Sequence, residues 1–222
     1  YEANVFTDDT KTILLVEDEA LIALNQKRVL QNNGLHVHVV HRGERAVRTV
    51  REDGEIDLVL MDIDLGGGID GIEAARRILE IREVPIVFLT GHAGQDTVRQ
   101  VRTITRYGYV LKNAGEFVLM EAIVTAFDLF ESQEALRRSE ARLSRVLQAA
   151  PIGIGIVRER VIHMVNDHVT DLCGYTAEEL VGNSIRMLYP TEEEFEAVGA
   201  EKYRLIRESG TGTVESRWRR KD

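Results

Sequence analysis

The first 130 residues alternate between short apolar runs and amphipathic segments, and this alternation strongly constrains the fold. The apolar runs read TILLV, LHVHVV, DLVLMD, PIVFLT and GYVLK, and they begin at residues 12, 35, 57, 85 and 108. Runs of this length are typical of strands buried on both faces, and a segment with helical apolar spacing follows each one. Five such units predict an α/β domain over residues 1–130, a parallel sheet with helices on both faces.

Polar or charged side chains follow four of the five predicted strands. Glu17 and Asp18 follow the first strand, Asp62 ends the third, Thr90 ends the fourth and Lys112 ends the fifth. In sheets of this kind, sites lie beyond the carboxyl ends of the strands. Because parallel strands end at the same edge, we expect these side chains to converge there.

The chemistry of these side chains indicates a metal and a phosphoryl group. Carboxylates that share a pocket repel each other unless a cation neutralises them. A set of oxygen ligands without His or Cys suits a hard ion, most simply Mg²⁺. A carboxylate beside Mg²⁺ can attack phosphorus and form an aspartyl-phosphate. Lys112 and Thr90 are suited to stabilise the charge of the transferred group.

Four motifs, LLVEDE, LVLMDIDLGGGIDGIEAARRI, PIVFLTG and YGYVLKN, make residues 10–128 resemble the receiver domain of two-component response regulators. The resemblance implies a flavodoxin-like, doubly wound sheet with strand order 2-1-3-4-5. It implies that Asp62 is the phosphoacceptor. It also implies that Asp18 and Asp62 bind Mg²⁺ by side chain, that Asp64 binds it through its backbone carbonyl, and that Glu17 is the outer member of the acidic pair.

The same resemblance gives roles to three residues on the last two strands. Lys112 bridges to the phosphoryl group, Thr90 is the hydroxyl switch and Tyr109 is the aromatic switch. Most receivers have a proline after this lysine, usually with a cis peptide bond, whereas Asn113 follows here. A cis bond before a residue other than proline costs ~2.5–4 kcal/mol. We therefore predict a trans bond between Lys112 and Asn113.

A rival interpretation is a haloacid-dehalogenase-type phosphatase, because MDIDL also resembles the DxD nucleophile motif of that family. Thr90 and Lys112 follow in a suitable order. Those phosphatases have an acidic pair after the lysine, whereas Glu17 and Asp18 lie on the first strand. This difference in chain order favours the receiver.

The segment from 115 to about 148 is predicted to be one continuous helix, and residues 131–150 form the linker between two domains. Leu129, Leu136 and Leu143 are spaced by seven. One interpretation is an amphipathic helix that lies on its own domain. The other is a two-stranded coiled coil, which would make the protein a homodimer.

Residues 132–222 resemble the start of a PAS sensor domain, through SEARLSRVLQAAPIGIGIV and VNDHVTDLCGYTAEELVG. The resemblance implies a small α+β domain over residues 151–222, incomplete at its C-terminal end. We expect strands at GIGIV and VIHMVN and the beginning of another in GTVESRWRRKD. The usual ligand residues are missing, so we expect no haem, flavin or metal in this part. We read Cys173 as a packing residue.

Composition limits the partners. The net charge of −9 argues against binding to nucleic acid or to anionic membranes. No apolar run approaches the ~20 residues that span a bilayer, and a single cysteine fits a reducing compartment, so we expect a cytoplasmic protein. The receiver resemblance implies a histidine kinase or phosphotransfer protein as partner. We expect a regulatory phosphoacceptor with at most slow autodephosphorylation. Its output would lie beyond residue 222: a histidine kinase or, alternatively, a diguanylate cyclase.

Overall fold

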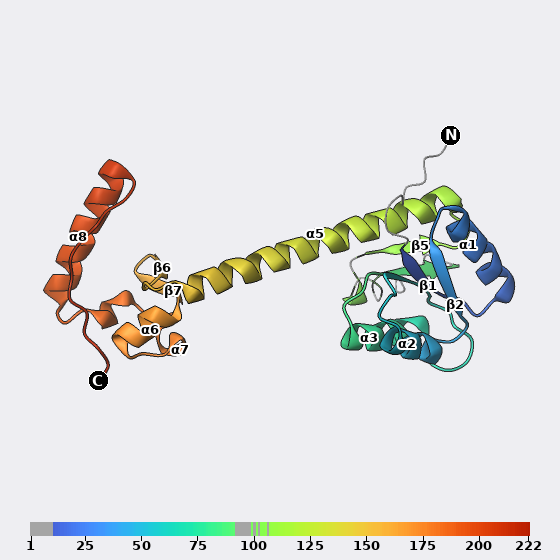
Figure 1. The fold of residues 1–222 in the computed structure, drawn as a ribbon, viewed down its shortest axis with the longest axis horizontal. Helices are drawn as coiled ribbons and strands as arrows, with labels where there is room; N and C mark the ends of the chain where they lie inside the picture. The colour runs from blue at the N-terminus through green and yellow to red at the C-terminus, as the bar shows by residue number, and fades with distance from the viewer. Residues whose placement is uncertain (1–10, 92–98, 100, 102, 106) are drawn as a thin grey trace. The chain divides into compact units, whose positions relative to one another are not determined.

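The computed structural model describes residues 11–91, 99, 101, 103–105 and 107–222 (Figure 1). The chain divides into two compact units between Leu136 and Arg137. No helix among the described residues combines the length and the apolar composition needed to cross a bilayer.

The first unit contains a five-stranded parallel sheet in the order β2-β1-β3-β4-β5, which confirms the predicted topology. The strands are β1 (Thr12–Val16), β2 (His36–Val40), β3 (Leu58–Asp62), β4 (Ile86–Thr90) and β5 (Tyr109–Leu111). The helices are α1 (Ala20–Asn32), α2 (Gly43–Glu52), α3 (Gly71–Ile81) and α5 (Glu116–Ala149). The helix predicted to follow the fourth strand, within residues 96–106, lies mostly outside the described residues.

Helices cover both faces of this sheet, with α2 and α3 on one side and α1 and the start of α5 on the other (Figure 1). Alternate residues of a strand point to opposite faces. Val59 and Met61 of β3 therefore pack toward α2 and α3, while Leu58 and Leu60 pack toward α1 and α5. Since both faces are covered, every residue of β3 and β4 is buried. β3 and β4 are apolar up to their last residue because both of their faces are buried.

The long helix α5 has 34 residues and continues without interruption through the predicted linker. Its buried residues all lie in its first third, at Leu119, Met120, Ile123, Ala126 and Phe127. Beyond them the three leucines of the heptad stripe are exposed by 41%, 61% and 60%. Leu129 and Leu136 belong to the first unit, and that unit does not cover them.

The second unit contains a two-stranded antiparallel sheet, short helical segments and the 18-residue helix α8. The elements are β6 (Gly155–Arg158), β7 (Val161–Val165), α6 (Asp167–Cys173), α7 (Ala177–Leu180), η1 (Ile185–Leu188) and α8 (Glu192–Ser209). Cys173 is fully buried in a small apolar core with Ile162, Val169 and Leu180, which agrees with its predicted packing role.

One predicted strand is wrong. Residues 211–222 have no regular secondary structure. A strand needs a neighbouring strand with which to form a ladder, and this segment instead makes isolated backbone bonds. The Arg219 and Lys221 N–H groups donate to the carbonyls of Leu188 and Cys173. Scattered bonds to two different helices hold the backbone in place without forming a strand.

Candidate functional site

The sheet brings the predicted site residues to one edge. β1 delivers Glu17 and Asp18, β3 ends at Asp62, and the chain after β5 delivers Lys112. The Lys112 N–H donates to the carbonyl of Thr90 over 2.9 Å, which extends the β4–β5 pairing to the residue beyond the strand. The convergence follows from parallel topology because neighbouring strands end together.

Lys112 connects the two buried carboxylates of this edge. Its Nζ lies 2.8 Å from Asp62 Oδ2, 2.9 Å from Glu17 Oε1 and 2.8 Å from Glu17 Oε2. Asp62 and Glu17 are fully buried, and the Lys112 side chain is only 15% exposed. Charge-assisted hydrogen bonds at such distances hold both acids in place. The opposite charges also offset part of the cost of burying each group.

Burial and charge shift the pKa of two of these groups. Burial raises the pKa of Glu17, the hydrogen bond from Lys112 opposes this, and the charge of Asp62 raises it further; the net direction is upward. For Lys112, burial alone would lower the pKa, but the hydrogen bonds to Asp62 and Glu17 outweigh it, so the pKa is raised. Lys112 therefore stays an ammonium throughout the physiological pH range.

Glu17, Asp18 and Asp62 form an acidic triad typical of the receiver Mg²⁺ site. One carboxylate oxygen from each lies within 4.8 Å of the others. Asp18 is the more exposed member, and its Oδ2 accepts a hydrogen bond from the Gly66 N–H over 2.9 Å. When ionised, three carboxylates face a single ammonium, so the site carries excess negative charge. An oxygen-only donor set with this excess fits a divalent hard cation.

The remaining predicted site residues lie around this triad. The Asp64 side chain is exposed. The backbone N–H of Asp64 donates to Asp62 Oδ1 over 3.2 Å and so helps to orient the Asp62 carboxylate. Thr90 is buried at the end of β4. Tyr109 pairs with Phe88 at the beginning of β5 and is 36% exposed. The Lys112–Asn113 bond is trans, as predicted, and the described residues contain no cis peptide bond.

Sequence reasoning missed two residues that shape the loop after β3. Glu44 of α2 accepts a hydrogen bond from the Ile69 N–H over 2.9 Å, which lowers the pKa of this glutamate. Gly71 begins α3 directly against the backbone of Asp62, where any Cβ would overlap the Asp62 carbonyl oxygen. The motif GIDG hinted at the glycine, but Glu44 lies 25 positions from its partner and gave no signal.

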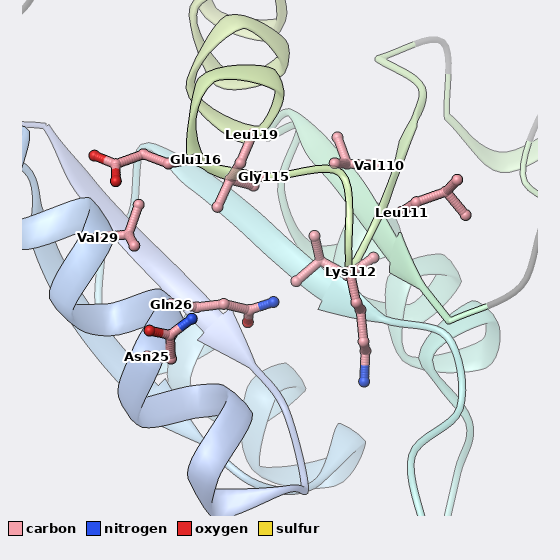
Figure 2. Close-up of a pocket in the computed structure, with 10 residues that line it drawn as sticks. Asn25, Gln26, Val29, Val110, Leu111, Lys112, Gly115, Glu116 and Leu119 are labelled. Atoms are coloured by element: carbon pink, nitrogen blue, oxygen red, sulfur yellow. The ribbon is translucent and has the colours of Figure 1, made fainter.

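A small pocket of about 80 Å³ lies at the same edge, between α1, β5 and the start of α5 (Figure 2). Gln26 of α1 and Lys112 line it, as do Val29, Val110 and Leu119. Gln26 is buried, and its Oε1 has no hydrogen-bond partner among the described residues. The stem of Lys112 thus borders this pocket while its ammonium contacts the acids.

Comparison with known families agrees with this geometry. Residues 13–124 match the response regulator receiver domain, and residues 151–222 match a PAS domain. Receiver membership excludes the rival phosphatase interpretation, which requires a different order of motifs along the chain.

Three individual proteins illustrate the similarity. The transcriptional regulatory protein PdtaR of Mycobacterium tuberculosis is 34% identical over 139 residues, which is 62% of this chain and 67% of PdtaR. The sensor kinase CckA of Brucella abortus is 28% identical over 125 residues, 55% of this chain but only 13% of CckA.

The third is a solved structure, the N-terminal domain of a response regulator/sensory box/GGDEF three-domain protein from Carboxydothermus hydrogenoformans. It is 41% identical with a TM-score of 0.52, and the match covers 55% of this chain and 98% of that domain. The strand order, the acidic triad and these matches together show that the chain belongs to the response regulator receiver family and carries a PAS domain after its receiver.

Proposed function

We propose that this protein accepts a phosphoryl group on Asp62 from a histidine kinase or phosphotransfer protein and passes the resulting change through α5 to its PAS domain. The observation that carries the proposal is the buried Asp62 carboxylate, ion-paired to Lys112 beside two further acids. A buried acid held at a strand end by a cation is oriented for attack and shielded from bulk water.

The reaction is a transfer between two nucleophiles. An Asp62 carboxylate oxygen attacks the phosphorus of a phosphohistidine, the new O–P bond forms as the N–P bond breaks, and the imidazole leaves with its electron pair. Lys112, already in contact with Asp62, then binds an oxygen of the phosphoryl group. The Thr90 hydroxyl and the Tyr109 ring serve as switches.

The metal site supports this transfer. Asp18, Asp62 and the Asp64 backbone carbonyl would hold Mg²⁺, with Glu17 as the outer member of the set. When bound, Mg²⁺ neutralises charge on the phosphoryl oxygens. Binding of Mg²⁺ is supported by the excess of negative charge, since three carboxylates lie beside a single ammonium.

The assignment of Asp62 is tested by phosphorylation with acetyl phosphate in the presence of Mg²⁺. Wild type should be labelled, and Asp62→Asn should not, because an amide cannot form the acyl phosphate. Asp128→Asn is the matched control, since this exposed residue on α5 undergoes the same change of charge and lies 66 positions from Asp62 in the chain. Labelling of Asp62→Asn as strong as that of wild type would refute the proposal.

The exposed leucine stripe of α5 supports a homodimer. A parallel second copy would cover Leu129, Leu136 and Leu143 and would bring two PAS domains together. In such a dimer a small rotation at the receiver is carried along both helices.

We further propose a cytoplasmic protein whose output domain lies outside this chain and is a histidine kinase. The similarity to the sensor kinase CckA favours this choice. The alternative is a diguanylate cyclase, favoured by the response regulator/sensory box/GGDEF order of the C. hydrogenoformans protein. Assay of the full-length gene product for autophosphorylation from ATP and for cyclic dinucleotide synthesis from GTP separates the two.

A further inference from the structure

Asn166, between β7 and α6, is a fully buried polar residue with an unusual set of partners. Its Oδ1 accepts hydrogen bonds from the N–H groups of Ile154 and Val169, over 2.9 and 3.2 Å. Its Nδ2 donates to the carbonyls of Leu147 and Ile152, both over 2.9 Å. All four hydrogen-bonding positions of the amide are therefore used.

The chemistry of the partners fixes the orientation of this side chain. Two partners are donors and two are acceptors, so a flipped amide would face its NH₂ toward N–H groups and its oxygen toward carbonyls. Only a side chain with both kinds of group fits the position. Aspartate would keep the two accepted bonds and lose the two donated ones.

Two of these bonds lie at helix ends. The Val169 N–H belongs to the first turn of α6, for which Asn166 is the N-cap. The Leu147 carbonyl belongs to the last turn of α5, where carbonyls have no partner within the helix. Pro151 follows shortly after and prevents the helix from continuing. A single side chain thus caps the end of the linker helix and the beginning of the first PAS helix.

A second contact reinforces this joint. The exposed Gln148, also in the last turn of α5, accepts a hydrogen bond at its Oε1 from the Asp167 N–H over 2.8 Å. The Asn166 N–H donates to the Ile154 carbonyl over 2.9 Å, so Asn166 and Ile154 are bonded in both directions. The end of α5 is consequently tied to the segment before β6 and to α6 at once.

We propose that Asn166 is the positioning residue through which a displacement of the linker helix reaches the PAS domain, with Gln148 as its exposed support. This inference rests on the proposed function, because it concerns how a change that begins at Asp62 continues past residue 149. If Leu147 is displaced, either Asn166 and its other partners move with it, or a fully buried amide loses a hydrogen bond, which is costly. A displaced helix end would therefore shift the β6–β7 sheet and α6 together.

Hydrogen exchange measured by mass spectrometry tests the inference on the whole chain, with and without acetyl phosphate and Mg²⁺. The variants are Asn166→Asp, which removes both donated bonds, and Gln148→Ala, which alters only an exposed residue and so spares the PAS core. Thr176→Ala is the control, because Thr176 caps α7 through a capping box, and its two hydrogen bonds there are both with Glu179.

In the unphosphorylated protein, Asn166→Asp should exchange amides at the end of α5 about tenfold faster, because a lost cap frays the last turn. In wild type, phosphorylation should change exchange over residues 152–173. That change should disappear in Asn166→Asp, fall by at least about half in Gln148→Ala, and persist in Thr176→Ala.

Each failure has its own signature. If wild type is not modified at Asp62, the proposed function fails. If Asp62 is modified but residues 152–173 respond equally in wild type and in both linker-end variants, or do not respond in wild type, the role of Asn166 is refuted. If Asn166→Asp does not fold, Gln148→Ala alone decides.

Discussion

At the scale of single residues, the site holds three carboxylates and one ammonium, so the Lys112 charge neutralises only part of the negative charge. Lys112 forms ion pairs with both Asp62 and Glu17. The third acid, Asp18, accepts a hydrogen bond from the backbone N–H of Gly66. Removing Lys112 would leave the buried carboxylates of Asp62 and Glu17 without their shared cation, which is costly.

The raised pKa of Glu17 predicts a pH dependence for metal binding. Protonating Glu17 removes a negative charge from the triad, so Mg²⁺ affinity should fall as the pH decreases through this pKa. Because burial first, and then the charge of Asp62, outweigh the hydrogen bond from Lys112, the decrease should begin above the ordinary value of 4.5. Calorimetric titration with Mg²⁺ between about pH 7 and 4 measures it.

Glu17→Gln provides the control for this prediction. Glutamine keeps the size of the side chain and an acceptor for Lys112, but it does not titrate. Its Mg²⁺ affinity should be weaker than that of wild type at pH 7 and should lack the early decrease. An affinity profile in this variant identical to that of wild type would show that another group is responsible.

The residues that form the triad could be predicted from the sequence because each one ends a buried strand or lies just after one. Asp62 ends a run that is apolar on both faces, and parallel strands must end together. Glu44 and Asn166 could not be predicted, because their partners become neighbours only when the chain folds. A side chain that bonds to distant backbone groups leaves no periodic pattern in the sequence.

At the scale of secondary-structure elements, the junction between β3 and α3 leaves no room for a Cβ at Gly71. Gly71→Ala should reduce the free energy of unfolding by about 1–3 kcal/mol, because its Cβ would overlap the backbone of Asp62 and the helix start would have to shift. Urea unfolding followed by circular dichroism measures the change.

Gly54→Ala is the matched substitution, because a Cβ at that position meets nothing within 4 Å. We expect it to be neutral or slightly stabilising. If Gly71→Ala unfolds at the same urea concentration as Gly54→Ala, the close approach of α3 to β3 is not an important constraint.

Helices and strands that have a clear apolar pattern of their own were predicted correctly. The strand that needed a second strand to pair with was not. β1 to β4 follow from their apolar runs, and α5 follows from a long stretch without proline. The prediction of a strand after Ser209 was wrong, because a strand-like sequence forms no strand unless a second strand lies beside it.

At the scale of the whole molecule, α5 predicts the association of two chains. Covering these two leucines of each chain, Leu136 and Leu143, which are 61% and 60% exposed, contributes about 1 kcal/mol per residue. Leu136→Asp with Leu143→Asp should therefore weaken the dimer by about 100-fold or more. Light scattering at tens of micromolar should show a wild-type dimer and a monomeric double variant.

Leu24→Asp is the control for this measurement. Leu24 of α1 is 65% exposed, close to the 61% of Leu136, but it lies outside the stripe. It should leave the dimer intact. A monomeric wild type, or a dimer that survives the double substitution, would contradict the proposed interface.

Because α5 is uninterrupted, the number of residues in the linker also sets the rotation of one end of the helix relative to the other. Each residue turns an α-helix by about 100°, so inserting one residue after Arg138 would turn Leu143 by about 100° from its present direction about the helix axis. Inserting seven would return it to within about 20°. Dimerisation should therefore be weaker after an insertion of one residue and should recover after an insertion of seven. We expect natural relatives with longer or shorter linkers to differ by whole heptads.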